Sequence, residues 1–121
     1  MDEPPAVVSA LAVDCHDPDT LATFWYELLG GELVVWPQYG VVALRAPGIT
    51  IDFTLVPEDK AGKNRLHLDL ATSDPGATVA RALQLGATRG DDIHVSNDFT
   101  VLRDPEGNEF CVLHEMPSTF P

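Results

Sequence analysis

Residues 15–31, CHDPDTLATFWYELLGG, decide the fold of this chain, because a degenerate copy follows at residues 72–87, TSDPGATVARALQLGA. Each stretch has Asp-Pro at its third and fourth positions, and this pair starts a helix: the aspartate caps the first turn and proline suits the first helical position. Each stretch ends in Leu-Gly, and glycine commonly ends a helix. Two copies of one helical unit in a single chain predict a duplicated fold.

Apolar and β-branched segments surround both helices in the same order, which predicts four strands in each copy. A turn, LRAPG at residues 44–48, recurs as LRDPEG at residues 102–107. Each copy is therefore βαβββ, with its helix on one side of mainly antiparallel strands. The predicted strands cover residues 7–15, 32–36, 41–45 and 49–56 in the first copy, and 65–72, 87–94, 99–103 and 108–114 in the second.

We therefore predict an α+β fold with two tandem βαβββ modules in one domain, residues 1–121, since this length usually makes one domain. Module one covers about residues 7–57 and module two about 65–116, and the polar residues 58–64 link them. Duplicated halves usually pack about a pseudo-two-fold axis. A pocket is expected where they meet.

The chain is acidic, with a formal net charge of −12, and 45% of its residues are hydrophobic. Nucleic acid and anionic membranes are therefore unsuitable partners. No apolar run approaches the ~20 residues of a membrane helix, and the acidic N-terminal residues do not resemble a targeting peptide. We expect a cytoplasmic protein. Cys15 and Cys111 fall on opposite faces of the predicted strands, so a disulfide is not expected.

Period-two alternation gathers polar side chains on the sheet face turned away from the helices. A face this polar in so small a domain is not expected to be core. We interpret it as the lining of a cup. Its members are Asp14, Asp52, His67, Asp69, Glu109 and Cys111.

Three motifs resemble the vicinal oxygen chelate superfamily, which holds glyoxalases, bleomycin resistance proteins and extradiol dioxygenases. They are DCHDPDTLATFWYELLGG at residues 14–31, NRLHLDLATSD at 64–74 and VLRDPEGNEFCVL at 101–113. The match is closest to the glyoxalase-like branch. The resemblance implies a cup-shaped mixed sheet around a ligand cavity, with helices on its outer face, and a homodimer. This scaffold carries both metal enzymes and metal-free binding proteins.

The resemblance also implies four metal-ligand positions, which fall on Ala10, His67, Cys111 and Asp52. A shift of one step along the strand would put Thr54 in place of Asp52. Ala10 has no donor atom, so one position is lost. A zinc site made of His67, Cys111 and Asp52 is conceivable, because zinc accepts nitrogen, sulfur and oxygen ligands. Glu109 lies two residues before the ligand position and is not counted.

The remaining candidates would contact a ligand directly. His67 is the candidate general base, with Asp69 positioned to orient it or to pair with a cation. Structural roles are the alternative for both: a hydrogen-bonded histidine and a solvated carboxylate. Trp36, Tyr39 and, more weakly, Phe99 could stack on a flat ligand, although ordinary packing or a dimer contact would also explain these rings.

Two functions fit these residues. The first is a metal-independent protein that binds a drug or secondary metabolite, aromatic or cationic in character, for sequestration or self-resistance, with no cofactor. The second is a metal-dependent lyase, isomerase or dioxygenase in which a divalent ion such as zinc, held by His67, Cys111 and Asp52, acts as a Lewis acid. An enzyme that uses His67 as its base without a metal is a third hypothesis.

Overall fold

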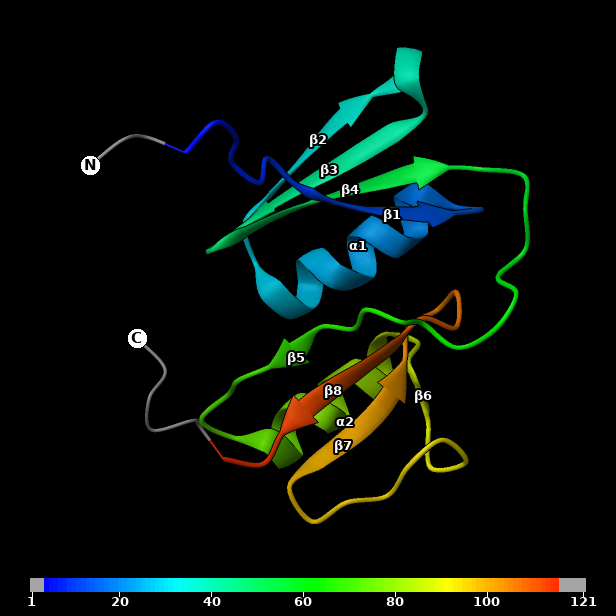
Figure 1. Cartoon of the computed structure of the whole chain (residues 1–121). Coiled ribbons are helices and arrows are strands. Elements are labelled where there is room, and N and C mark those ends of the chain that lie inside the picture. The colour runs from blue at the N-terminus through cyan, green and yellow to red at the C-terminus, as the bar shows by residue number, and fades with distance from the viewer. Residues whose placement is uncertain (1–3, 116–121) are drawn as a thin grey trace. The chain divides into compact units, whose positions relative to one another are not determined.

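The structure is a computed structural model that describes residues 4–115 of the chain. The contacts divide the chain between Glu58 and Asp59 into two compact units. Within the described residues, each unit contains one α-helix and four strands in the same order (Figure 1).

The first unit forms a mixed sheet with strand order β1-β4-β3-β2, in which β1 runs parallel to β4 and the other pairs are antiparallel. Helix α1 contacts β2, β3 and β4. A short 3-10 turn, Pro37–Tyr39, joins β2 to β3. The elements are β1 (Leu11–Cys15), α1 (Pro18–Leu29), β2 (Glu32–Trp36), β3 (Val41–Ala46) and β4 (Ile49–Leu55).

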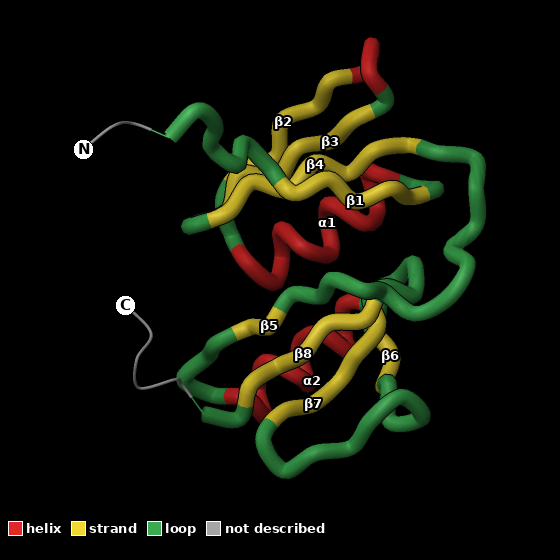
Figure 2. The backbone as a smooth tube through the Cα atoms, viewed as in Figure 1, coloured by secondary structure: helices red, strands yellow, loops and turns green. Residues whose placement is uncertain are grey.

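The second unit repeats this arrangement with strand order β5-β8-β7-β6, and again the first strand runs parallel to the last. Helix α2 contacts β8 (Figure 2). The same topology in both units confirms the predicted βαβββ duplication and the α+β fold class. The elements are β5 (Asp69–Leu70), α2 (Pro75–Leu85), β6 (Thr88–Arg89), β7 (Phe99–Arg103) and β8 (Glu109–Leu113).

The two Asp-Pro motifs start both helices in the same way. Asp17 has φ −133° and ψ 82°, and its carboxylate accepts a hydrogen bond from the backbone N–H of Thr20 at 3.2 Å. Asp74 has φ −137° and ψ 84°, and accepts from the N–H of Ala77 at 3.0 Å. Each carboxylate satisfies a donor that the first turn leaves unpaired, which is why this local motif fixes the helix start.

The core of each unit is built from the alternating residues of its two central strands. In the first unit Val42 pairs with Phe53 and Leu44 with Ile51, and all four are buried. In the second unit Leu102 pairs with Phe110, and both are fully buried. Removing one such side chain from water contributes about 1.5–3 kcal/mol.

Three strands are shorter than predicted by four residues or more. The predicted strand at residues 65–72 is reduced to β5, which pairs with β8 alone, and the strand at 87–94 is reduced to β6. After β6 the chain turns, because the N–H of Ile93 bonds back to the carbonyl of Gly90 at 2.9 Å. The first strand begins at Leu11 rather than at residue 7.

Cys15 and Cys111 are both buried, and neither forms a disulfide. Among the described residues, neither α-helix has the length and apolar character needed to cross a bilayer.

Gly31 provides a test of the junction between α1 and β2. Its φ is +98°, and a Cβ atom there would lie 2.2 Å from the carbonyl oxygen of Arg45. Gly30 also has a positive φ, +75°, but a Cβ there would meet nothing within 4 Å. We expect Gly30→Ala to lower the free energy of unfolding by about 1–3 kcal/mol through backbone strain alone. Gly31→Ala should cost about 1–3 kcal/mol more, because overlap adds to strain.

Urea denaturation of the two variants beside the wild type measures this difference. Equal stability of the two variants would contradict the close approach of Gly31 to β3.

Candidate functional site

Strand register places the candidate residues of module two together. In the parallel pair β5–β8, Asp69 lies opposite Cys111. In the equivalent pair β1–β4, Ala12 lies opposite Asp52. The register therefore makes Asp52, rather than Thr54, the counterpart of Cys111 in the repeat.

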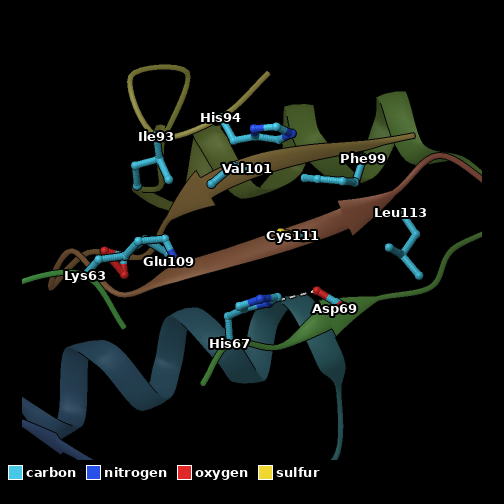
Figure 3. Close-up of a pocket in the computed structure, with 10 residues that line it drawn as sticks. All are labelled: Lys63, His67, Asp69, Ile93, His94, Phe99, Val101, Glu109, Cys111 and Leu113. Atoms are coloured by element: carbon cyan, nitrogen blue, oxygen red, sulfur yellow. Dashed lines mark hydrogen bonds and ion pairs between the residues drawn. The ribbon is translucent and has the colours of Figure 1, made fainter. Parts of the chain in front are cut away.

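A pocket of about 240 Å³ opens on this face of module two. Figure 3 shows the His67–Asp69 pair beside β8 on one side of it, and Ile93 and His94 beside β7 on the other. Every lining residue belongs to the second unit. They are Lys63, His67, Asp69, Ile93, His94, Phe99, Val101, Glu109, Cys111 and Leu113.

His67 and Asp69 form the polar end of the pocket. The Nδ1 atom of His67 lies 3.0 Å from Oδ1 of Asp69. Because a carboxylate accepts, Nδ1 carries the hydrogen in this contact and Asp69 orients the ring. The two side chains are 40% and 50% exposed, so both can meet a ligand.

Cys111 lies in the pocket floor and its thiol is not activated. Burial raises its pKa above the ordinary value, and the negative charge of Asp69 and a hydrogen bond to Asp69 raise it further. A thiol with a raised pKa stays protonated at neutral pH and is a poor nucleophile. Cys111 is therefore a small buried residue of the pocket floor rather than a nucleophile.

Glu109 also lines the pocket, but its carboxylate is held by other groups. Oε1 lies 3.1 Å from Nζ of Lys60, and Oε2 accepts from the N–H of Asn64 at 2.9 Å. The side chain is only 6% exposed. Burial alone would raise its pKa, yet the hydrogen bonds from Asn64 and Lys60 outweigh burial and lower it. Glu109 thus fastens residues 60–64 to β8.

Aromatic and apolar side chains complete the walls. Phe99 stacks on the ring of His94, with centroids 5.4 Å apart and planes at 19°. The prediction named Phe99 but missed Lys63, Ile93 and His94. Ile93 and His94 were predicted to lie in a strand, and they lie instead in the loop after β6. Val101 and Leu113 could have been found, because they alternate in phase with Phe99 and Cys111.

Other predicted residues lie in the first unit. Trp36, just before the 3-10 turn, is 40% exposed, and Tyr39, the last residue of the turn, is 71% exposed. Asp52 is partly exposed and pairs with Ala12 and Ala43. Their roles in stacking, ligand binding or a dimer contact stay predictions, as does a pocket shared by both modules.

One set of metal-type donors occurs among the described residues. His67, Asp69 and Cys111 each offer an atom, and these atoms all lie within 4.8 Å of one another. The set differs from the predicted His67, Cys111 and Asp52, because Asp69 provides the carboxylate. Nitrogen, oxygen and sulfur donors fit zinc in type. Binding of a metal ion would require Cys111 to lose the proton of its raised-pKa thiol. The hydrogen bond from Nδ1 of His67 to Asp69 leaves Nε2 open to a metal.

The sequence profile of the glyoxalase-like domain family matches residues 10–113. The chain belongs to this family. The predicted resemblance to the glyoxalase-like branch of the vicinal oxygen chelate superfamily is thereby confirmed. No curated protein matches the chain by sequence.

Solved structures share this fold. A glyoxalase/bleomycin resistance protein from Albidiferax ferrireducens T118 is 26% identical, with TM-score 0.65, and the match covers 90% of this chain and 98% of that one. A glyoxalase/bleomycin resistance protein/dioxygenase family enzyme from Burkholderia phytofirmans PsJN is 19% identical, with TM-score 0.70 and coverage of 86% and 94%. The fosfomycin resistance protein FosX from Mesorhizobium loti is 11% identical, with TM-score 0.71 and coverage of 93% and 94%.

Because Lys60 and Asn64 bind the carboxylate of Glu109 in the folded state, we expect the stability of this glyoxalase-like protein to depend on pH. A lowered pKa in the folded state means that the ionised form stabilises the fold above the unfolded pKa, near 4.5, and that this stabilisation is lost as the pH falls through the folded pKa. We expect Glu109→Gln to lower the free energy of unfolding at pH 7 by about 1–3 kcal/mol, as for hydrogen bonds to a charged group. The difference from wild type should shrink towards pH 3.

Urea denaturation at pH 7 and pH 3 measures this effect, with Glu58→Gln, at an exposed position, as the control. A difference that is the same at both pH values would contradict a role for the ionised carboxylate.

Proposed function

We propose that this protein binds a small organic molecule in the module-two pocket, and that binding without a metal ion is its function. The observation that carries the proposal is the pocket's chemistry. Apolar side chains provide most of the wall, and one oriented polar pair, His67–Asp69, lies at its end. Small-molecule sites typically combine apolar walls with a few placed polar groups.

The ligand in this proposal is flat and carries a hydrogen-bond donor or a positive charge. The stacked rings of Phe99 and His94 provide a wall that suits an aromatic ring. Asp69 offers a half-exposed carboxylate, whereas the carboxylate of Glu109 is already bound by Lys60 and Asn64. The volume of about 240 Å³ suits one or two fused rings.

Metal independence is supported by the donors themselves. Ala10 supplies none, and the pKa of Cys111 is raised. A protonated thiol must lose its proton before it can bind a metal, which weakens the affinity at neutral pH. Binding of an organic ligand requires none of these changes.

The proposed biological role is sequestration of a drug or secondary metabolite in the cytoplasm, as self-protection. The names of two similar structures support this role. One is a glyoxalase/bleomycin resistance protein and the other is a fosfomycin resistance protein. We also propose a homodimer, for which the exposed rings of Trp36 and Tyr39 are available.

A second candidate function is a glyoxalase-like metal enzyme, which the donor cluster favours. His67, Asp69 and Cys111 would hold the ion. A divalent ion bound there would supply a Lewis acid that polarises a substrate oxygen. In that case His67 would serve as a ligand and could not act as the general base through the same nitrogen.

A ligand panel tests the proposed function. In the presence of chelator, we expect 2-naphthamidine, a flat cation, to raise the melting temperature of the protein in a dose-dependent way. At 100 times the dissociation constant, a ligand adds about 2.7 kcal/mol of stability. The matched anion 2-naphthoate should give a smaller shift, because it meets the charge of Asp69.

Asp69→Asn should reduce the shift with 2-naphthamidine, whereas Asp19→Asn, at an exposed position of α1, should leave it unchanged. No shift with any member of the panel, or shifts that appear only after zinc is added, would contradict the proposal.

A further inference from the structure

The loop between β6 and β7 forms one wall of the pocket. Ile93 and His94 from this loop line the pocket, and Phe99, the first residue of β7, stacks on His94. The loop has no regular ladder to hold it, so a few specific contacts must set its position. Two of them lie at its start: the N–H of Gly90 bonds to the carbonyl of Val101 at 2.9 Å, and Arg103 pairs with Asp92 at 2.7 Å.

The end of the loop is held by His114, which directly follows β8. Its backbone N–H bonds to the carbonyl of Asp98 at 2.9 Å. Its ring bonds twice: Nδ1 lies 2.6 Å from the carbonyl of Asn97, and Nε2 lies 2.7 Å from the hydroxyl of Thr100. These three contacts bracket Phe99 on both sides along the chain.

Strand alternation places His114 on the sheet face opposite the pocket. Phe99 pairs in register with Leu113, and both line the pocket. Thr100 and His114, the next residues, line a separate hollow on the α2 side. His114 is therefore not among the pocket residues, although it fixes the backbone from which Phe99 projects.

The hydrogen-bond chemistry assigns a definite tautomer to His114. A carbonyl only accepts, so Nδ1 carries a hydrogen towards Asn97. The hydroxyl of Thr100 can then donate to Nε2 of the neutral ring, and it can accept from Nε2 of the charged ring.

We propose that His114 is a positioning residue for the aromatic wall made by Phe99 and His94. Its N–H at Nδ1 is the essential group. The significance of the wall for ligand binding rests on the proposed function, but the positioning itself does not. A failure of every ligand to bind would remove the proposed function and leave this inference in place.

The rate at which a reagent labels Cys111 measures how firmly the aromatic wall is held in place, because this thiol lies in the pocket floor and is only 8% exposed. We would label the intact protein with iodoacetamide at pH 8 and follow each cysteine separately by peptide mass spectrometry. His114→Ala should speed the labelling of Cys111 by about fivefold, the change in opening expected for the loss of a hydrogen bond. Cys15, buried in the first unit, serves as the internal control and should not change.

His114→Asn is the matched variant, because its amide N–H₂ can replace Nδ1–H as the donor to Asn97. It should label Cys111 at close to the wild-type rate. Equal rates for the alanine and asparagine variants, or a parallel increase at Cys15, would overturn the proposal. If His114→Ala does not fold, Thr100→Val is judged by the same Cys111 and Cys15 rates, with a smaller increase expected at Cys111.

Discussion

The parallel pairing of the first and last strand of each module is the constraint on which the site depends. A parallel pair needs a crossover connection, and in both modules that connection begins with a helix capped by Asp-Pro. In module two this pairing sets Asp69 beside Cys111 and leaves His67 two residues earlier, within 3.0 Å of Asp69. Without this register the His67–Asp69 pair would not lie beside Cys111.

The two carboxylates that line the pocket have different partners and different exposure to solvent. Glu109 is nearly buried, and its charge is compensated by Lys60 and the N–H of Asn64. It therefore holds residues 60–64, which belong to the link between the two modules in the sequence, against β8. Asp69 remains half-exposed and orients His67. One carboxylate therefore serves the fold and the other faces the ligand site, although Glu109 belongs to β8 and Asp69 lies on the strand paired with it.

Local signals made much of the fold predictable. The Asp17-Pro18 and Asp74-Pro75 caps are self-contained chemistry, and the apolar alternation around Phe53 and Phe110 marks the central strands. Edge strands β5 and β6 were predicted too long, because an edge strand's length depends on its partner and not on its own composition.

The candidate site was predictable only where it follows strand alternation. That pattern brings His67, Asp69 and Cys111 to one face. It cannot place His94, which lies in a loop, or show that Lys60 and Asn64 occupy the carboxylate of Glu109, since these contacts join distant parts of the chain. His114 is invisible to the sequence for the same reason: its partners are two backbone carbonyls and a hydroxyl.

The central claim is that the pocket holds an organic ligand and needs no metal, even though His67, Asp69 and Cys111 lie close together. Elemental analysis of protein purified without chelator, with zinc, nickel, manganese and iron measured per chain, tests it most directly. We predict far less than one ion per chain, unchanged in His67→Ala and in the control His16→Ala. Close to one ion per chain, lost in His67→Ala and kept in His16→Ala, would contradict the account and favour the metal enzyme.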